Sequence, residues 1–272
     1  MKIENKLSIS TGMFYFMDFE RSLKIIKASG IKNIEVAGYW KDRDWEVGQH
    51  LHNYSLNDII KLADKYNLNI LSFHDLSGAI YSMHDDVITK VGKQVLYNDR
   101  IENLVTHIPY CLETDLQKNE YKKMIYDKYK AITRGKNVLL ENSSEIKDYS
   151  PILENKNEIK KFCESANTFL NLDISHLYEN GENIINYINQ FKSLIKAIHV
   201  SGYDMVKGKV SFNNDQCNVL AVLNYLNCEK LAFITIESEF EKKNASNKYY
   251  IEICKDLKNS IIKYFEKRSK QK

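Results

Sequence analysis

The chain has 272 residues, of which 43% are hydrophobic and 28% charged, and its formal net charge is +3. These values are ordinary for a globular protein, and so weak and scattered a charge does not favour nucleic-acid binding. The opening MKIENKLSIS lacks an apolar signal core, and no run approaches the ~20 apolar residues of a membrane span. Five cysteines without a C-x-x-C spacing argue against a disulfide framework or a zinc knuckle. Composition therefore predicts a reduced, cytoplasmic protein with no membrane contact.

Eight short apolar runs, rich in β-branched residues, are typical of buried strands. A segment with helical character follows each of them. In chain order, the strands are predicted at Leu7–Thr11, Asn33–Ala37, Asn69–Phe73, Asn103–Ile108, Asn137–Glu141, Thr168–Asp173, Lys196–Val200 and Ala232–Glu237.

The intervening segments place apolar residues at a spacing close to 3.6, which indicates helices. The first helix, over 19–28, stops at Gly30, and the second, over 55–66, begins with a capping-box-like Ser-x-x-Asp. Further helices are predicted over 86–101, 115–133, 156–166, 182–193, 214–227 and 247–267.

Strand and helix alternate eight times, which predicts a parallel sheet, and a single closed (β/α)8 TIM barrel over 1–272 is the most economical arrangement. An open doubly wound sheet is the alternative, but the first turn, TGMFY at 11–15, lacks the pattern G-x-G-x-x-G. The connection over about 38–54 is the one long insertion, and we interpret it as a lid or substrate loop. A lysine-rich tail over about 267–272 is interpreted as a solvated C-terminus.

Histidine and carboxylate side chains recur where the predicted strands end. In a (β/α)8 barrel these ends meet at one mouth, where active sites lie. Imidazole and carboxylate groups bind divalent Mn, Zn, Fe or Co, and clustered carboxylates repel one another unless a cation lies among them. The sequence therefore predicts a divalent metal ion as cofactor, of open identity. The candidate residues are His74, His107, Glu141, Asp173, His176, His199 and Glu237.

Each of these residues alone has a simpler interpretation. A single histidine at a strand end is most often a hydrogen-bonded packing residue, and Asp173 could be the N-cap of a following helix. The metal prediction depends on the recurrence from strand to strand. The other histidines, His50, His52 and His84, lie in predicted loops or at a helix start and are interpreted as surface residues.

The same series of residues resembles the xylose isomerase-like TIM-barrel superfamily. That group includes sugar phosphate isomerases and epimerases, and nucleases of the endonuclease IV type. The resemblance covers nearly the whole chain and is strongest in VLLEN, LNLDISHLYENG, IKAIHVSG and ITIES. The segment GKVSF at 208–212 is also similar to the family's G-E-I-D-W step.

Resemblance to the epimerases implies one divalent ion held by the set Glu141, Asp173, His199 and Glu237. It implies that the ion polarises the carbonyl of a hydroxy-ketone while Glu141 and Glu237 exchange a proton as acid and base. His176 is implied to contact a substrate oxygen. The partner would be a small sugar, sugar phosphate or polyol.

Resemblance to the nucleases implies more ions at the same mouth. His74 and His107 would hold a second ion with Glu141, and His176 would serve a third. The segment SGYDMVKGKVSF at 201–212 lacks the histidine that the third ion needs, which argues against phosphodiester cleavage. The role of His74 and His107 therefore stays open: they are either ligands of a second metal ion or residues that bind substrate.

Two loops are expected to contact substrate. Tyr39, Trp40 and Trp45 are predicted as apolar walls, with simple packing as an equal alternative. Where epimerases of the family usually have an arginine after the seventh strand, Lys209 or Lys207 is expected to replace it. The leading prediction is a metal-dependent sugar isomerase or epimerase. A metal-dependent hydrolase or phosphoesterase, or a tailoring enzyme on another metabolite, is the alternative, and a homo-oligomer stays open.

Overall fold

The computed structural model describes residues 3–38, 51, 53–75, 90–112, 119–132, 137–143, 149–153 and 155–269. Within these residues, eight parallel strands close into a barrel, which confirms the predicted (β/α)8 fold and excludes an open sheet. Neighbouring strands follow chain order, and the last pairs with the first. The barrel strands are β1 (Leu7–Ser10), β2 (Asn33–Gly38), β3 (Asn69–Asp75), β4 (Asn103–His107), β6 (Asn137–Glu141), β8 (Phe169–Asp173), β9 (Ile195–Val200) and β12 (Phe233–Ile236).

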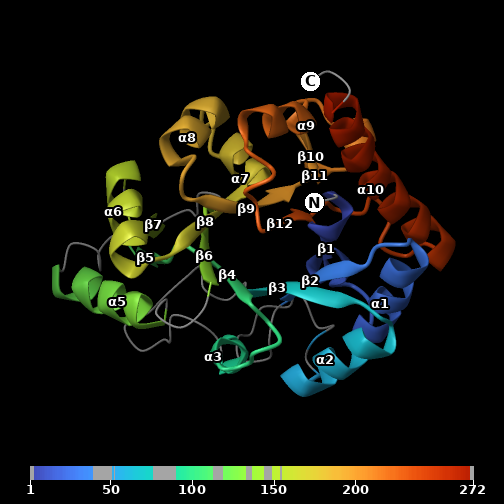
Figure 1. Cartoon of the computed structure of the whole chain (residues 1–272), viewed down its shortest axis with the longest axis horizontal. Helices are drawn as coiled ribbons and strands as arrows, with labels where there is room; N and C mark the ends of the chain where they lie inside the picture. The colour runs from blue at the N-terminus through green and yellow to red at the C-terminus, as the bar shows by residue number, and fades with distance from the viewer. Residues whose placement is uncertain are drawn as a thin grey trace.

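Helices form an outer ring around these strands (Figure 1). Their apolar faces pack against the outward-facing strand residues in one large core. The last helix lies against the first, so the two ends of the chain cover the same side of the barrel. The helices are α1 (Phe19–Ala28), α2 (Leu56–Lys65), α3 (Lys90–Leu96), α5 (Asn119–Ile132), α6 (Lys156–Ala166), α7 (Ile174–Glu179), α8 (Ile184–Phe191), α9 (Val219–Val222) and α10 (Asn247–Ser269).

Two small antiparallel sheets lie outside the barrel. One pairs β5 (Tyr110–Leu112) with β7 (Tyr149–Pro151), and the other is a hairpin of β10 (Gly202–Asp204) and β11 (Gly208–Val210). The hairpin follows directly on β9, so it begins at the carboxyl end of a barrel strand, where the predicted mouth lies.

The predicted strands agree with the structure to within two residues at each end. The largest difference is in β3, which extends to Asp75 and places His74 inside the strand rather than after it. Ser55 forms the predicted capping box with Asp58 at the start of α2. These local signals were readable because each depends on residues that are neighbours in the sequence.

The helix predicted over 214–227 is wrong. Only α9 is α-helical there, with short 3-10 turns on either side at Phe212–Asn214 and Leu223–Tyr225. The Asp215 carboxylate accepts three backbone N–H groups, one of them from β10, and so ties this segment to the hairpin. Asn218 then has a φ of +51°, a left-handed conformation that cannot continue into a helix from the preceding residues.

Side chains along the barrel strands alternate between the interior and the surrounding helices. A small apolar cluster fills the interior, and a histidine or glutamate follows two positions further along three of its strands. Because the side-chain period of a strand is two, these polar residues point inward as well. The pairs are Val105 and His107 on β4, Leu139 and Glu141 on β6, and Ala197 and His199 on β9.

Lys6 links the start of β1 to the loop before β12, where the barrel closes. Its side chain is buried, and Nζ donates to the carbonyls of Glu229 at 2.7 Å and Leu231 at 2.6 Å. A buried ammonium is tolerated only when it is hydrogen-bonded, and these carbonyls supply that pairing. The contact therefore fixes the closing pair of strands at the end of the barrel opposite the mouth.

We expect Lys6→Met to lower the free energy of unfolding by about 2–3 kcal/mol, because buried carbonyls lose a charged donor. Urea unfolding followed by circular dichroism measures this change. The matched control is Lys230→Met, which removes an exposed lysine from the same loop. Equal unfolding midpoints for the two variants would contradict the assignment.

No helix among the described residues is both long enough and apolar enough to cross a bilayer. Several predicted features lie outside the described residues: most of the 38–54 loop and the end of the lysine-rich tail after Ser269. The predicted residues affected are Tyr39, Trp40, Trp45, His50, His52 and His84.

Candidate active site

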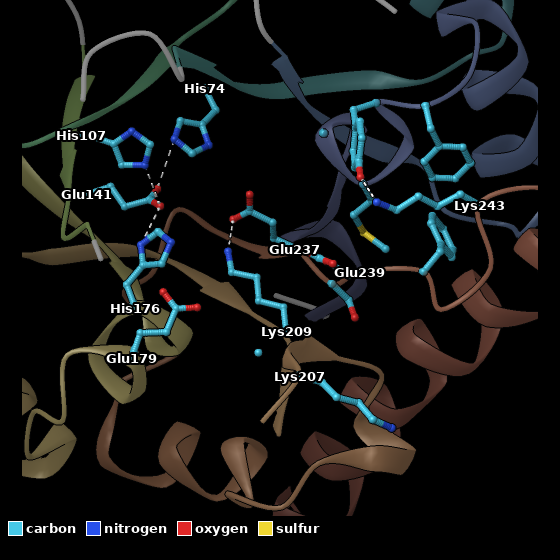
Figure 2. A pocket seen from close by; sticks show the side chains of 17 residues that line it. His74, His107, Glu141, His176, Glu179, Lys207, Lys209, Glu237, Glu239 and Lys243 are labelled. Carbon is cyan, nitrogen blue, oxygen red and sulfur yellow. Dashed lines mark hydrogen bonds and ion pairs between the residues drawn. The ribbon is translucent and has the colours of Figure 1, made fainter. Parts of the chain in front are cut away.

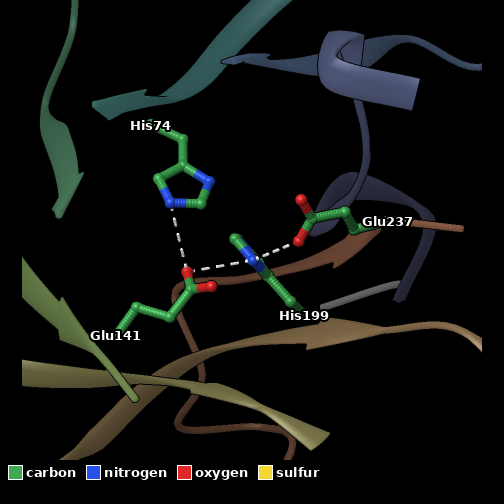
Figure 3. Close-up of side chains that lie close together, drawn as sticks. All are labelled: His74, Glu141, His199 and Glu237. Atoms are coloured by element: carbon green, nitrogen blue, oxygen red, sulfur yellow. Dashed lines mark ion pairs between the residues drawn. The ribbon is translucent and has the colours of Figure 1, made fainter. Parts of the chain in front are cut away.

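Glu141 is the centre of a buried cluster at the carboxyl ends of the strands. Its side chain is fully buried, and four imidazoles surround its carboxylate (Figures 2 and 3). His199 Nδ1 lies 3.1 Å from Oε2, and His74 Nε2 lies 3.5 Å from the same oxygen. On the other side, His107 Nε2 is 3.5 Å and His176 Nδ1 is 3.7 Å from Oε1. One carboxylate thus joins residues from five βα units.

His199 connects this cluster to Glu237, which follows β12. Its Nδ1 lies 2.8 Å from Glu237 Oε2, so the imidazole stands between the two glutamates (Figure 3). His199 is fully buried, whereas the Glu237 side chain keeps 18% of its surface exposed. The structure therefore brings together six of the seven predicted residues around Glu141 and His199.

Asp173, the seventh, has partners of a different kind. Its Oδ1 accepts the backbone N–H groups of Ser175 at 2.7 Å and His176 at 3.2 Å, so it is the N-cap of α7, as the simpler interpretation predicts. Its Oδ2 accepts a hydrogen bond from Lys209 Nζ at 2.8 Å. The carboxylate is thus paired with an ammonium, and its role as a metal ligand stays a prediction.

Glu35 of β2 belongs to the cluster and was missed by sequence reasoning. It is fully buried, and both of its carboxylate oxygens lie 3.1 Å from His199 Nε2. Ser72 Oγ donates to Oε2 at 2.7 Å, and His74 Nδ1 lies 3.7 Å from Oε1. The available signal was a charge in the middle of the apolar strand NIEVA, where a surface residue is not expected.

Two groups of side chains among the described residues have the geometry to hold an ion, with their ligand atoms within 4.8 Å of one another. The first is His74, Glu141, His199 and Glu237, and the second is His107, Glu141 and His176. Buried polar atoms are normally hydrogen-bonded, yet both nitrogens of His74 and Oε1 of Glu141 form no hydrogen bond of acceptable geometry. Such nitrogen and oxygen donors match a divalent transition metal.

The electrostatic environment keeps the carboxylates of the cluster ionised. Burial raises the pKa of Glu141, but His199 and His74 outweigh burial and hold that pKa well below its ordinary value. Burial acts in the same direction on Glu237, and there Lys209 and His199 hold the pKa low. Both glutamates are therefore available as ligands or as proton acceptors.

The imidazoles of the second group are also suited to bind an ion. Burial lowers the pKa of His107, which favours the neutral form that ligates metals. His176 Nδ1 lies 2.7 Å from the Asn142 carbonyl oxygen and donates to it, which leaves a lone pair on Nε2. A backbone partner of this kind fixes the tautomer and orientation of a metal-binding histidine.

The cluster opens into a cavity of about 500 Å³. Figure 2 shows His74, His107, Glu141 and His176 on one side of it, with Glu237 and Lys209 next to them. Its lining also includes the aromatic residues Tyr15, Phe16 and Phe240, together with Lys207 and Lys243. The cavity therefore combines the polar residues of the cluster with aromatic side chains.

A closed barrel with a buried histidine–carboxylate cluster at its mouth defines a TIM barrel with a candidate metal site. No family model and no curated protein matches the sequence. Solved structures match the chain in fold. A xylose isomerase domain containing protein of Salmonella typhimurium LT2 has a TM-score of 0.67 at 14% sequence identity, and the match covers 96% of this chain and 99% of that protein. An IolI protein with a binding zinc atom has a TM-score of 0.67 at 16% sequence identity, and the match covers 95% of this chain and 99% of that protein.

An L-ribulose 3-epimerase has a TM-score of 0.64 at 14% identity, with 97% of this chain and 96% of that chain covered. At sequence identities this low, the matches establish a shared fold and no more. The chain shares the (β/α)8 barrel fold of these proteins, and this shared fold agrees with the resemblance predicted from its sequence.

Proposed function

We propose that the chain is a divalent-metal-dependent isomerase or epimerase of a small sugar, sugar phosphate or polyol. The observation that carries the proposal is that the carboxylates of Glu141 and Glu237 both lie at His199 Nδ1, with both glutamates lining one cavity. Support for this class of enzyme also comes from the fold shared with an L-ribulose 3-epimerase.

His74, Glu141, His199 and Glu237 would hold the ion, because these four side chains offer ligand atoms around one point. When bound, the ion would polarise the carbonyl of a hydroxy-ketone and so lower the pKa of the adjacent C–H. Glu35 would serve this group indirectly by accepting the Nε2–H of His199.

Proton transfer falls to the two glutamates. Their low pKa values keep both as carboxylates, so either can accept a proton from the carbon next to the carbonyl. Return of a proton from the opposite side inverts that carbon, which requires two groups on different sides of the substrate. Glu141 ends β6 and Glu237 follows β12, and these strands are not neighbours in the barrel.

The rest of the cavity would bind and enclose the substrate. Tyr15, Phe16 and Phe240 offer an apolar wall for the C–H face of a sugar, and exclusion of water there would strengthen the electrostatics of the site. Lys207 and Lys243 would favour a substrate that carries an anionic group.

We expect Glu237→Gln to reduce turnover about 10²–10⁴-fold, because the amide cannot accept a proton. The test combines elemental analysis of chelator-free protein with deuterium exchange at the carbon next to the carbonyl, followed by NMR in D₂O over a panel of ketoses. The expected result is at least one ion per chain and exchange in one of these substrates. Glu239→Gln, an exposed neighbour of Glu237, is the matched control. Protein that binds no ion after reconstitution would contradict the proposal.

A metal-dependent hydrolase is the second candidate. The observation that favours it is the group His107, Glu141 and His176, which would place another ion beside the first with Glu141 shared between them. Paired ions can stabilise the attacking and leaving oxygens of a displacement. Two ions per chain, with one lost in His107→Ala and hydrolysis of phosphoester substrates, would favour this function over the isomerase.

A further inference from the structure

Lys209 places a buried cation against two carboxylates of the site. Its Nζ donates to Asp173 Oδ2 at 2.8 Å. The same nitrogen lies 3.3 Å from Glu237 Oε2 (Figure 2). Only 14% of the side chain is exposed. A lysine amine is charged at neutral pH, and the two carboxylates beside Nζ pair with that charge. An ammonium therefore lies between Asp173 and Glu237, at the edge of the buried cluster.

The backbone around Lys209 is built to hold this position. Lys209 pairs with Tyr203 across the β10–β11 hairpin. At the turn, the Asp204 carboxylate accepts the N–H groups of Val206 at 2.8 Å and Lys207 at 2.9 Å. At the base, a Cβ on Gly202 would lie 2.5 Å from the backbone oxygen of Ser211, the residue after β11, so the close approach requires glycine. The lysine is thus presented by a fixed hairpin.

Lys209 and the candidate ion would share one ligand. Glu237 Oε2 lies near Lys209 Nζ and is also 2.8 Å from His199 Nδ1, inside the four-residue group that has the geometry for an ion. A divalent ion on this carboxylate would stand within a few ångströms of the ammonium, in a buried site where like charges repel strongly. Simultaneous occupancy of both positions is therefore unfavourable.

We propose that Lys209 is a tethered competitor of the divalent ion. Its ammonium occupies the Asp173–Glu237 side of the site, and ion binding displaces it toward the cavity. The inference rests on the ion site proposed above. It means that the chain binds its ion more weakly than its ligands alone would allow, and that the bound ion frees Lys209 to contact an oxygen of the substrate.

The test compares Mn²⁺ affinity of the wild type and Lys209→Met by equilibrium dialysis with elemental analysis. We expect the variant to bind Mn²⁺ at least tenfold more tightly, because the shared ligand Glu237 loses its competing cation. Lys207→Met is the matched control, since it removes a positive charge from the exposed turn of the same hairpin. Equal or weaker binding by folded Lys209→Met overturns the inference. Absence of binding in every protein would instead overturn the ion site.

A second measurement uses only the wild type, in case Lys209→Met fails to fold. Amines are labelled with acetic anhydride in chelator and in saturating Mn²⁺, and the Lys209 peptide is quantified by mass spectrometry. Labelling of Lys209 is expected to rise several-fold with Mn²⁺, while labelling of Lys207 stays constant. Unchanged or reduced labelling of Lys209, in protein shown to bind Mn²⁺, overturns displacement.

Discussion

Glu141→Gln is expected to abolish tight binding of divalent ions and to lower activity by about 10³-fold or more. The substitution keeps the size of the side chain but removes its charge and one oxygen acceptor. Both candidate groups contain Glu141, so no other single change affects every predicted ligand set. Elemental analysis after dialysis against Mn²⁺ or Zn²⁺ measures the loss directly.

The control for this variant must carry the same chemical change in the same cavity. Glu179→Gln meets that requirement, because Glu179 lines the cavity, is exposed and belongs to neither ion-binding group. It should retain the ion content of the wild type. Circular dichroism in chelator shows whether Glu141→Gln is folded. A folded variant with wild-type ion content would exclude Glu141 as a ligand.

The fold and most of the cluster were predictable because their signals are local. An apolar run with a polar residue at its end is visible in a few neighbouring residues, and the two-residue period of a strand carries that residue inward. Leu139 and Glu141 show this clearly: the first fills the apolar interior and the second lies one layer above it. Closure of the barrel then brings the strand ends together, so the sequence around each residue does not need to specify its partners.

Contacts between side chains from distant segments were not predictable. Lys209 was expected to hold substrate, yet its partners are Asp173 and Glu237, and only the path of the hairpin determines that. The helix predicted over 214–227 failed for a related reason. Its spacing is helical, but Asp215 binds a backbone group of β10, and that tertiary contact overrides a weak local preference.

Glu35 illustrates the same limit and leads to the second large effect that we expect. It lies on β2, within a strand whose neighbours Ile34 and Val36 are buried in the outer core, and its partner His199 is 164 positions away in the chain. A strand-end search cannot find such a residue. The structure places its carboxylate against His199 Nε2, on the side of the ring opposite the Nδ1 that faces Glu141 and Glu237.

This arrangement makes Glu35 a positioning residue for the ion site. Because the carboxylate accepts the Nε2–H, the neutral His199 ring that binds an ion directs its lone pair at the glutamates through Nδ1. An amide at position 35 can present its NH₂ group instead, which favours the opposite tautomer. Glu35→Gln is therefore expected to weaken Mn²⁺ or Zn²⁺ binding about 10–100-fold while the barrel stays folded.

Ser72→Ala is the matched control, because it removes a hydrogen bond to the same carboxylate without a change in the acceptor of His199. Its ion affinity should stay near that of the wild type. Nitrogen-15 NMR of the histidine rings in Zn²⁺-loaded protein adds a readout that simple packing would not alter: the proton of His199 should lie on Nε2 in the wild type, and Glu35→Gln should lose that pattern. Wild-type affinity together with an unchanged tautomer in Glu35→Gln would reduce Glu35 to a buried space-filling residue.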